Sequence, residues 1–210
     1  MDMDNNIPKT KSSRKSSFKE VLEWIQAILI AVVLAFLIRG FVFEQALVDG
    51  SSMQDTLQDE QRIIVYKLGY FFHSPERGDI ITLEYQRGIF NFLPVPDPEE
   101  IDYIKRVIAI PGDEIDIKDD GYVYVNGVKL SEPYAKGITE RKNMDFPIKI
   151  PQKKVFVLGD NRENSSDSRI IGLIDFDRIR GKAVFRLFPF KDLGLIYSNM
   201  KGANIKDLED

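Results

Sequence analysis

The sequence predicts a mostly β protein in which an N-terminal transmembrane helix precedes a coiled antiparallel β-sheet or barrel-like domain. One apolar run of membrane length, at residues 21–43, predicts the helix. Short runs rich in β-branched and aromatic residues recur from residue 44 onward and predict the strands. The sequence contains no second long helical pattern, which favours antiparallel sheets over alternating strands and helices.

Composition limits the classes of function. The 210 residues carry 29 Lys and Arg against 33 Asp and Glu, a net charge of −4. This acidic balance, with no concentrated basic stripe in the main body, argues against nucleic acid as a partner. There are no cysteines and one histidine, which excludes disulfides, thiol catalysis and cysteine zinc sites. We therefore expect neither a cofactor nor a metal, and the oligomeric state stays open.

The N-terminal segment predicts how the chain lies in a membrane. Residues 1–20 form a polar tail with a basic cluster, and we expect residues 1–15 to be disordered. The cluster consists of Lys9, Lys11, Arg14, Lys15 and Lys19. The 23 residues from 21 to 43 would span roughly 35 Å as a helix, enough for a bilayer core of about 30 Å. Basic residues before an apolar segment predict a cytoplasmic N-terminus.

These features predict a single-pass protein of the cell membrane with four segments. Residues 1–20 would be a cytoplasmic tail, 21–43 the transmembrane anchor, 44–198 the extracytoplasmic β-rich domain and 199–210 a polar C-terminal tail. Two alternatives compete with the anchor. The unbroken apolar core, Ala27–Ile38, has only 12 residues, as in a cleavable signal peptide, but no Ala-x-Ala site follows it. The other alternative is a buried helix of a soluble protein, against which the basic cluster counts.

Seven strands are expected in the β-rich domain. They cover residues 62–66, 79–83, 103–110, 114–118, 122–125, 154–158 and 183–188. Asp120-Gly121 and Asn126-Gly127 are turn dipeptides between strand-like runs and predict hairpins. Residues 92–98 form a proline-rich run that cannot be a central strand.

The residues Asp49–Leu57 lie a short way past the apolar run and carry two adjacent serines, Ser51 and Ser52, behind Gly50. A serine hydroxyl is a weak nucleophile until a base takes its proton. The single histidine, His73, lies between aromatic residues and a turn, where a half-buried structural position is the more common case. A base other than histidine is therefore favoured, and a hydrolase that uses His73 is kept as an alternative.

Lys105 is the lysine most suited to act as a base. Free lysine has a pKa of about 10.4 and is protonated at neutral pH, but burial lowers this pKa by up to about 3–5 units. Alternation along Tyr103–Ile110 places Lys105 on one face with Val107 and Ala109, where an unpaired charge would be costly. A lysine that protects an edge strand from aggregation is an equally good interpretation of the spacing.

A third segment, Gly159–Arg169, follows a predicted strand and contains no aliphatic or aromatic side chain. A calcium loop is excluded by position, because Arg162 and Ser165 stand where a ligand and a glycine are required. This composition directly after a buried strand suits a dense hydrogen-bond network better than a plain surface loop.

These three segments, in this order and behind an apolar anchor, resemble the type I signal peptidases. Residues 50–57 are similar to the family's Ser-Met-x-Pro-Thr box, residues 105–113 to its lysine box, and residues 159–169 to its Gly-Asp-Asn…Ser-x-Asp-Ser-Arg box. Arg77–Ile80 matches a shorter Arg-Gly-Asp element. The resemblance covers about residues 20–190 and fits the compact single-anchor members of Gram-positive bacteria.

The resemblance implies a serine endopeptidase that removes signal peptides from exported preproteins through an acyl-enzyme. Ser52, the serine directly before the methionine, would attack, and Lys105 would be the general base. Ser165 would hydrogen-bond that lysine, while Asp167 and Arg169 would brace the site.

Three positions depart from the family's pattern. Asp55 stands where the family has proline, so the turn after Ser52 would be less rigid. Ala109 replaces a common glycine. Gly50 stands where some members supply an oxyanion-binding serine, so backbone N–H groups, chiefly that of Ser52, are expected to hold the oxyanion.

The resemblance also implies the partners, which are signal-peptide-bearing preproteins and the lipid bilayer. An extended substrate would add as a β-strand near Gln45–Val48 and Asp102–Ile104. Shallow apolar pockets would accept small side chains at the first and third positions before the cut. Two alternatives stay open: a membrane-tethered serine hydrolase with a different substrate, and a non-catalytic anchored β-module that binds exported chains.

Overall fold

The computed structural model of the chain describes residues 14–86 and 101–197. Within it, Met1–Arg39 and Gly40–Asp210 form two compact units. Three sequence predictions fall wholly or mainly outside the described residues: the disorder of the first 15 residues, the proline-rich run and the polar C-terminal tail. The division of the chain into four segments stays a prediction.

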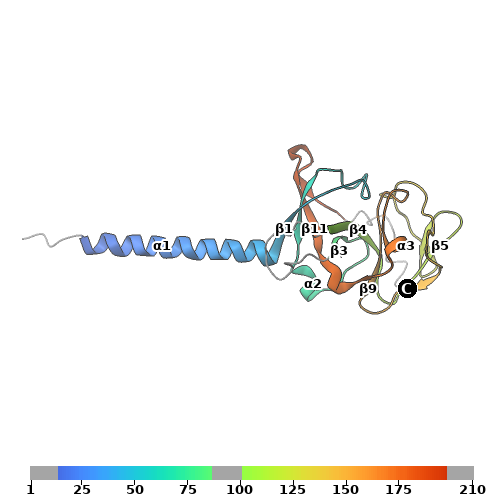
Figure 1. Ribbon diagram of the computed structural model, residues 1–210, viewed down its shortest axis with the longest axis horizontal. Coiled ribbons are helices and arrows are strands. Elements are labelled where there is room, and N and C mark those ends of the chain that lie inside the picture. Colours follow the sequence, from blue (N-terminus) through green and yellow to red (C-terminus); the bar gives the residue numbers. More distant parts are fainter. Residues whose placement is uncertain (1–13, 87–100, 198–210) are drawn as a thin grey trace, which may run out of the picture. The chain divides into compact units, whose positions relative to one another are not determined.

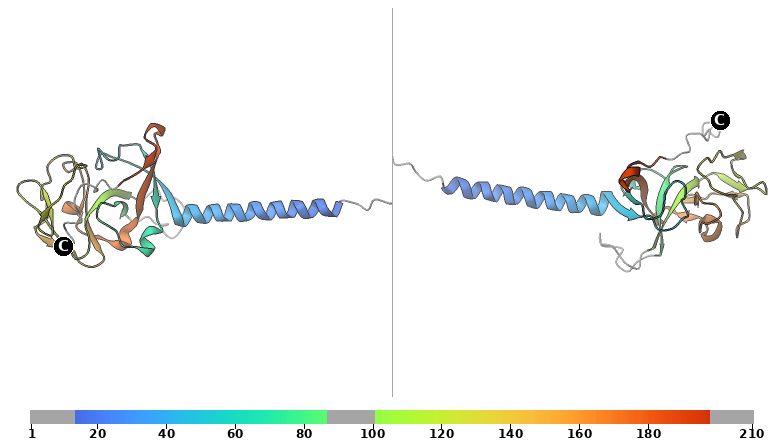
Figure 2. Two further views of the ribbon diagram at one scale, coloured as in Figure 1. Left: turned by 180° about the vertical axis from the view of Figure 1, so that it is seen from behind. Right: turned by 90° about the horizontal axis from the view of Figure 1, so that it is seen from above.

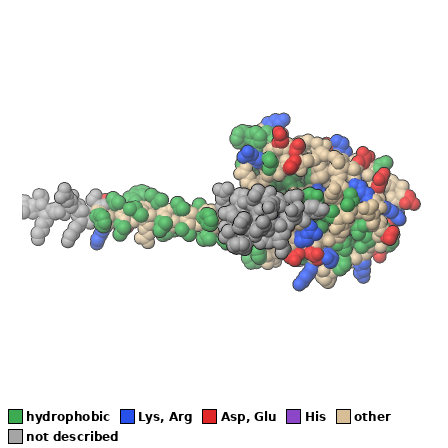
Figure 3. Space-filling model, viewed as in Figure 1, with side chains coloured by type: hydrophobic (Ala, Val, Ile, Leu, Met, Phe, Trp, Pro, Cys, Tyr) green, Lys and Arg blue, Asp and Glu red, His purple; other side chains and the backbone are tan. Residues whose placement is uncertain are grey.

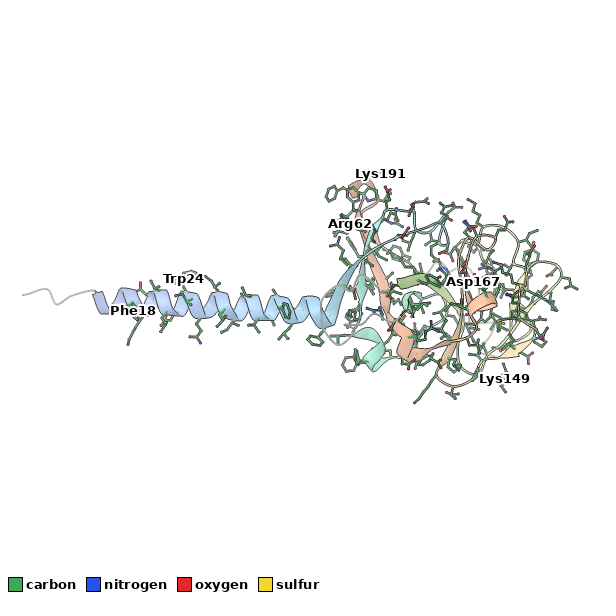
Figure 4. All side chains as sticks on the ribbon, viewed as in Figure 1. Phe18, Trp24, Arg62, Lys149, Asp167 and Lys191 are labelled. Atoms are coloured by element: carbon green, nitrogen blue, oxygen red, sulfur yellow. The ribbon has the colours of Figure 1, made fainter. Side chains whose placement is uncertain are left out.

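The first unit contains the apolar helix. Helix α1, Arg14–Leu37, continues into a short π-helix, η1, Ile38–Val42. The stretch Phe18–Val42 reaches a mean hydropathy of 2.6 with none of that window buried, and it is the one described helix long and apolar enough to cross a membrane. Hydrophobic side chains cover this helix in Figure 3, and Phe18 and Trp24 project from it in Figure 4. Such exposure disagrees with the alternative of a helix buried in a soluble domain.

The larger sheet of the second unit is antiparallel and runs in the order β1-β2-β11-β3-β4-β9-β10, with β12 paired to β11 (Figure 1). Its strands are β1 (Phe43–Leu47), β2 (Arg62–Tyr66), β3 (Ile80–Gln86), β4 (Ile101–Ala109), β9 (Lys154–Leu158), β10 (Ile174–Asp175), β11 (Ile179–Phe188) and β12 (Gly194–Leu195). The predicted mostly β antiparallel fold is confirmed. Within the described residues, however, the path is open and the sheet does not close into a barrel.

A smaller antiparallel sheet, in the order β7-β6-β5-β8, lies at the end of the unit remote from β1 (Figures 1 and 2). Its strands are β5 (Glu114–Ile117), β6 (Val123–Val125), β7 (Val128–Lys129) and β8 (Ile148–Lys149). Asn126 and Gly127 join β6 to β7 with φ angles of 53° and 81°, the two positive values that a type I′ hairpin requires. Strands of two residues, such as β7 and β8, escape prediction because they are too short to show alternation.

Hydrophobic clusters of the second unit join the two sheets and the turn between β1 and β2, which carries Ser52 and is called the serine turn below. Phe156 and Leu158 of β9 share one cluster with buried residues of the smaller sheet. A second cluster lies under the residues that follow β1 and contains Met53 and Leu57, both almost fully buried. The turn that carries Ser52 is therefore anchored in the core on its C-terminal side. The short helices described in this unit are α2 (Gly69–Phe72), α3 (Ser168–Ile171), η2 (Phe176–Arg178) and η3 (Phe190–Asp192).

Truncation of Phe156 tests the placement of this core. Phe156 is fully buried and packs edge to face on Phe146, with 5.9 Å between the ring centroids. Phe156→Ala leaves a cavity, so we expect the free energy of unfolding to fall by about 3–5 kcal/mol. Phe190→Ala is the matched control, because Phe190 is 76% exposed and its truncation should change stability by about 0.5 kcal/mol or less. Unfolding of the full-length protein in detergent measures the loss of stability in both variants. An equal loss in Phe156→Ala and Phe190→Ala would contradict the placement of Phe156 in the core.

Candidate active site

Ser52 lies in the turn between β1 and β2, whose backbone is fixed on both sides of the serine. Before it, Gly50 has a φ of +96°, a left-handed conformation that residues with side chains rarely adopt. The Gly50 N–H donates to Asp59 Oδ1 at 2.8 Å. After the serine, the Thr56 N–H donates to the Met53 carbonyl at 2.9 Å. These local hydrogen bonds fix the backbone on both sides of Ser52.

Lys105, on β4, reaches Ser52 from a distant part of the sequence. Its Nζ lies 2.9 Å from Ser52 Oγ and 2.9 Å from the carbonyl oxygen of Ile104. The centroid of the Tyr103 ring lies 4.9 Å from the same nitrogen. Lys105 is only 3% exposed, which disagrees with the interpretation as a lysine that protects an edge strand by projecting into solvent.

Burial controls the protonation of Lys105. Desolvation of the ammonium lowers the pKa of Lys105 to about 8, against the opposing effect of the Asp167 and Asp160 carboxylates. Close to that pH about half of the amine is neutral, whereas an exposed lysine would be almost wholly protonated. A neutral amine 2.9 Å from a hydroxyl is within reach of its proton.

Asp167 and Arg169 form a fully buried ion pair close to the site. Arg169 donates from Nε and from one terminal nitrogen to the two oxygens of Asp167, both at 2.8 Å. The Gly159 N–H donates to the same carboxylate at 3.1 Å, and Asp167 also caps helix α3. Burial would raise the pKa of Asp167, but these hydrogen bonds outweigh it and hold the pKa below its usual range. Such contacts are what a bracing role requires.

The Ser165 hydroxyl is buried, yet it makes no hydrogen bond to any residue that the structure describes. It lies near the Asp167 carboxylate without hydrogen-bond alignment, and the expected hydrogen bond to Lys105 is not formed. The position of Ser165 depends on Gly159. A Cβ atom at Gly159 would come within 2.3 Å of Ser165 Oγ and 2.6 Å of the Ser52 carbonyl oxygen. Because Gly159 has no side chain, the segment that carries Ser165 can approach the segment that carries Ser52.

Two asparagines that the sequence analysis did not single out hold the serine pair. The Asn161 N–H donates to the Ser52 carbonyl at 3.0 Å, and the Asn161 side-chain amide donates to the Ser51 carbonyl at 3.1 Å. The Asn164 amide donates to the Ser51 hydroxyl at 2.6 Å. The side-chain bonds join residues 110 and 113 positions apart, so no local spacing could have indicated them.

A buried ion pair ties the lysine strand to the serine turn. Arg106, next to Lys105, donates to both oxygens of Asp160 at 2.8 and 2.7 Å, and neither side chain is exposed. Thr56, in the serine turn, donates to the same carboxylate. The pair therefore sets the position of β4 relative to the turn.

Asp55, which stands where the family pattern has proline, lies outside this network. Its side chain is 76% exposed, and its carboxylate lies 4.0 Å from Lys136 Nζ. Arg186 donates to the carbonyl oxygen of the next residue, Thr56, at 2.8 Å, and the Thr56 hydroxyl donates to the buried Asp160 carboxylate. These contacts of Thr56 help to hold the turn.

An open cleft of about 360 Å³ lies beside the two candidate catalytic residues. Residues 47–53 form one wall and Asp102–Lys105 the other, and Asn164 and Ser166 also line the cleft. The Ser52 N–H donates to no acceptor in the described chain, so it is available to an incoming carbonyl oxygen. The Gly50 N–H is already bonded, so Gly50 contributes through its backbone conformation.

Comparison with known proteins agrees with this geometry. The family model described as "Signal peptidase, peptidase S26" matches residues 21–188. The chain belongs to this signal peptidase family. Signal peptidase I of Bacillus licheniformis is 42% identical over 192 residues, which covers 87% of this chain and 96% of that protein. Signal peptidase IB of Staphylococcus aureus (strain COL) is 38% identical over 190 residues, covering 83% and 93%.

A solved structure also matches the chain. The crystal structure of a signal peptidase I from Enterococcus faecalis V583 is 30% identical, with a TM-score of 0.38. The match covers 52% of this chain and 97% of that chain.

The histidine of this S26 family member lies outside the cleft lining. His73 is exposed at the end of α2, where its Nδ1 lies 3.3 Å from the carbonyl oxygen of Gly69. A base must lie within hydrogen-bond reach of the nucleophile, directly or through one water. The position of His73 therefore argues against the alternative hydrolase that would use it.

Removal of Asp160 tests the ion pair that supports this S26 site. Asp160→Ala would leave the Arg106 guanidinium buried without a counter-charge, so we expect the free energy of unfolding to fall by about 3–5 kcal/mol. Asp175→Ala is the matched control, because Asp175 pairs with Lys154 while 47% exposed and should contribute less than about 1 kcal/mol. Thermal or denaturant unfolding of the purified protein compares the two. A loss no larger than that of the control would show that the buried pair does not support the fold.

Proposed function

We propose that this protein is a membrane-anchored serine endopeptidase that removes signal peptides from exported preproteins, with Ser52 as the nucleophile and Lys105 as the general base. The observation that carries the proposal is the 2.9 Å contact between a buried amine of lowered pKa and a serine hydroxyl in an open cleft. Relatives named signal peptidase I and IB, which are 42% and 38% identical over most of the chain, support the substrate class.

The proposed reaction has two steps. In the first, the neutral amine of Lys105 takes the proton of Ser52 Oγ while the oxygen attacks the carbonyl carbon of the scissile bond. Negative charge develops on the carbonyl oxygen, where the Ser52 N–H can donate to it. The Lys105 ammonium then protonates the leaving nitrogen, and the C–N bond breaks to leave an acyl-enzyme. In the second step Lys105 takes a proton from water, whose oxygen attacks the ester carbon. The Lys105 ammonium then returns that proton to Ser52 Oγ as the C–O bond breaks, which releases the carboxyl product and restores both residues.

Four neighbours are proposed to keep these groups in position. Asp167 and Arg169 hold the polar segment behind the lysine through their buried ion pair. Gly50 sets the approach of the chain to the nucleophile through its left-handed backbone. Ser165 would hydrogen-bond the Lys105 amine once substrate has closed the site, because catalytic hydrogen bonds often tighten only in the substrate complex.

An extended substrate would add a β-strand to the larger sheet inside the cleft. Among the described strands, β1 pairs with β2, and β4 pairs with β9 from Arg106 onward, so no described strand pairs with the other edge of β1 or continues the β9 pairing along β4 before Arg106. Backbone hydrogen bonds to these edges would bind a peptide strand without regard to its sequence. Val48, Met53 and Ile104 supply apolar walls that would select small side chains at the first and third positions before the cut.

The apolar helix α1 is proposed as the anchor. Its length and composition suit a bilayer, and the basic residues that precede it predict a cytoplasmic N-terminus with the β-rich unit outside the cell membrane. A tethered enzyme of this kind meets preproteins where they leave the membrane.

A non-catalytic β-module that binds exported chains is less well supported. Such a module would gain nothing from a buried lysine, since desolvation of an ammonium costs free energy. The desolvation of Lys105 beside Ser52 is instead what an amine base needs.

Substitution of the dyad tests the proposal directly. The full-length protein in detergent is incubated with a preprotein, and the shorter product is quantified. Ser52→Ala and Lys105→Met should each lower kcat/KM by about 10,000-fold or more, and the double variant should be no worse, because the residues act as a unit. His73→Ala is the control and should keep the wild-type rate. No product from the wild type would favour the binding module, and loss of activity in His73→Ala would favour the histidine-dependent hydrolase.

The pH dependence follows from the Lys105 base. The amine acts only when neutral, so kcat/KM should rise about tenfold per pH unit below its pKa of about 8 and level off above it. Initial rates at substrate concentrations well below KM measure this profile. A rise centred near the ordinary lysine value of 10.5 would contradict the desolvated base.

A further inference from the structure

Asp102 lines the same cleft as Ser52 and Lys105, but the proposed chemistry does not use it. It lies on β4, three residues before Lys105. Each strand residue rises about 3.3 Å, so the two positions are roughly 10 Å apart along the strand. An extended peptide beside β4 would therefore pass Asp102 about three residues away from the bond that is cut.

The sheet places Asp102 in an unfavourable electrostatic position. In the register of β3 and β4, Asp102 stands directly opposite Glu84, and like charges in such a pair destabilise a sheet. Glu44 on β1 adds a third carboxylate to the cluster. Burial and the two glutamates raise the pKa of Asp102 to about 7.

Two cations offset part of this negative charge. Arg180, on β11, contacts Asp102 Oδ1 with Nε at 3.0 Å and Glu84 with a terminal nitrogen at 4.0 Å. Lys67, after β2, pairs with Glu44 at 3.1 Å and opposes the rise in the pKa of Asp102. Asp102 thus has two carboxylates and two cations among its described neighbours. Asp102 is the member of this group that lines the cleft.

We propose that Asp102 is a specificity-determining residue whose carboxylate favours substrates with a basic side chain in this part of the cleft and disfavours acidic ones. The inference rests on the proposed function, because it assigns a charge preference to the same cleft. The Asp102 side chain is 31% exposed, which leaves it open to a substrate but partly shielded from solvent. Asp49, on the other wall, is also exposed and serves as the matched carboxylate control.

The test uses the full-length protein in detergent and a series of matched peptides. Alanine is kept at the first and third positions before the cut, and lysine, glutamine or glutamate is placed at the second, fourth or fifth position in turn. At the position nearest Asp102, the wild type at about pH 8.5 should cleave the lysine peptide about tenfold faster in kcat/KM than the glutamate peptide. Asp102→Asn should reduce this ratio to about one to two, whereas Asp49→Asn should preserve most of it.

The wild type provides a second measurement that needs no variant. The cleavage rates of both peptides depend equally on the protonation of Lys105. The ratio of the two rates at one pH therefore does not change with the titration of Lys105. As the pH falls through about 7, Asp102 gains a proton and the lysine-to-glutamate ratio should fall towards one. Among the described residues, the charged groups that face Asp102 are Glu44 on β1, Lys67 after β2, Glu84 on β3 and Arg180 on β11.

Three results would overturn the inference: a wild-type ratio near one at every position, a ratio unchanged by Asp102→Asn, or an equal loss in Asp49→Asn. If Asp102→Asn does not cleave even the glutamine peptide, the pH series of the wild type decides. A wild type that cleaves no peptide of the series would overturn the proposed function itself, and the charge preference with it.

Discussion

One amine must stay away from water while it touches a hydroxyl, and much of the second unit serves that requirement. Burial of the Lys105 ammonium costs free energy, and this cost lowers the pKa of the group to about 8. The nearby Asp160 and Asp167 carboxylates act in the opposite direction, which keeps the pKa from falling further. Each of these carboxylates is paired with a buried arginine, so its effect on the amine is limited. The protonation of Lys105 thus reflects a balance between desolvation of its ammonium and the attraction of two carboxylates that arginines already neutralise.

Buried arginines organise the segments around the site. Arg106, Arg162 and Arg169 are all at most 1% exposed. Their bidentate partners are Asp160, Glu132 and Asp167, respectively. Buried ion pairs of this kind contribute little net stability compared with a hydrophobic core, but loss of one partner is costly. The contacts of these pairs join the serine turn, the lysine strand β4 and the polar segment that follows β9.

The cleft lies where the strand pairing of the larger sheet ends in the described part of the chain: β1 pairs with β2, and β4 pairs with β9 from Arg106 onward. Strand edges are a liability in a folded protein, because any extended chain can pair with them. In this protein residues 47–48 and 102–105 line an open cleft beside Ser52, so a chain that paired there would lie next to the serine. Asp102 of the same cleft stands opposite Glu84 in the sheet, and Arg180 contacts both carboxylates. Such strand edges are understandable if the cleft receives a peptide.

Local patterns were enough to predict the apolar helix, seven of the described strands and the two hairpins, and to make Lys105 and the adjacent Ser51 and Ser52 candidates. The choice of Ser52 came from the family resemblance, and strand β1 was not predicted. Such patterns are encoded within a few consecutive residues, through apolar length, alternation and turn chemistry. The same alternation fitted a buried lysine and an edge lysine equally well. Whether Lys105 meets a hydroxyl depends on a side-chain contact between residues 53 positions apart, which only the folded chain shows. The hydrogen bonds of Asn161, and the buried Ser165 hydroxyl that no described residue bonds, likewise depend on contacts between distant segments. For Lys105 and Asp102 the register of β4 is also decisive, because a shift by one residue would turn each side chain to the other face of the sheet.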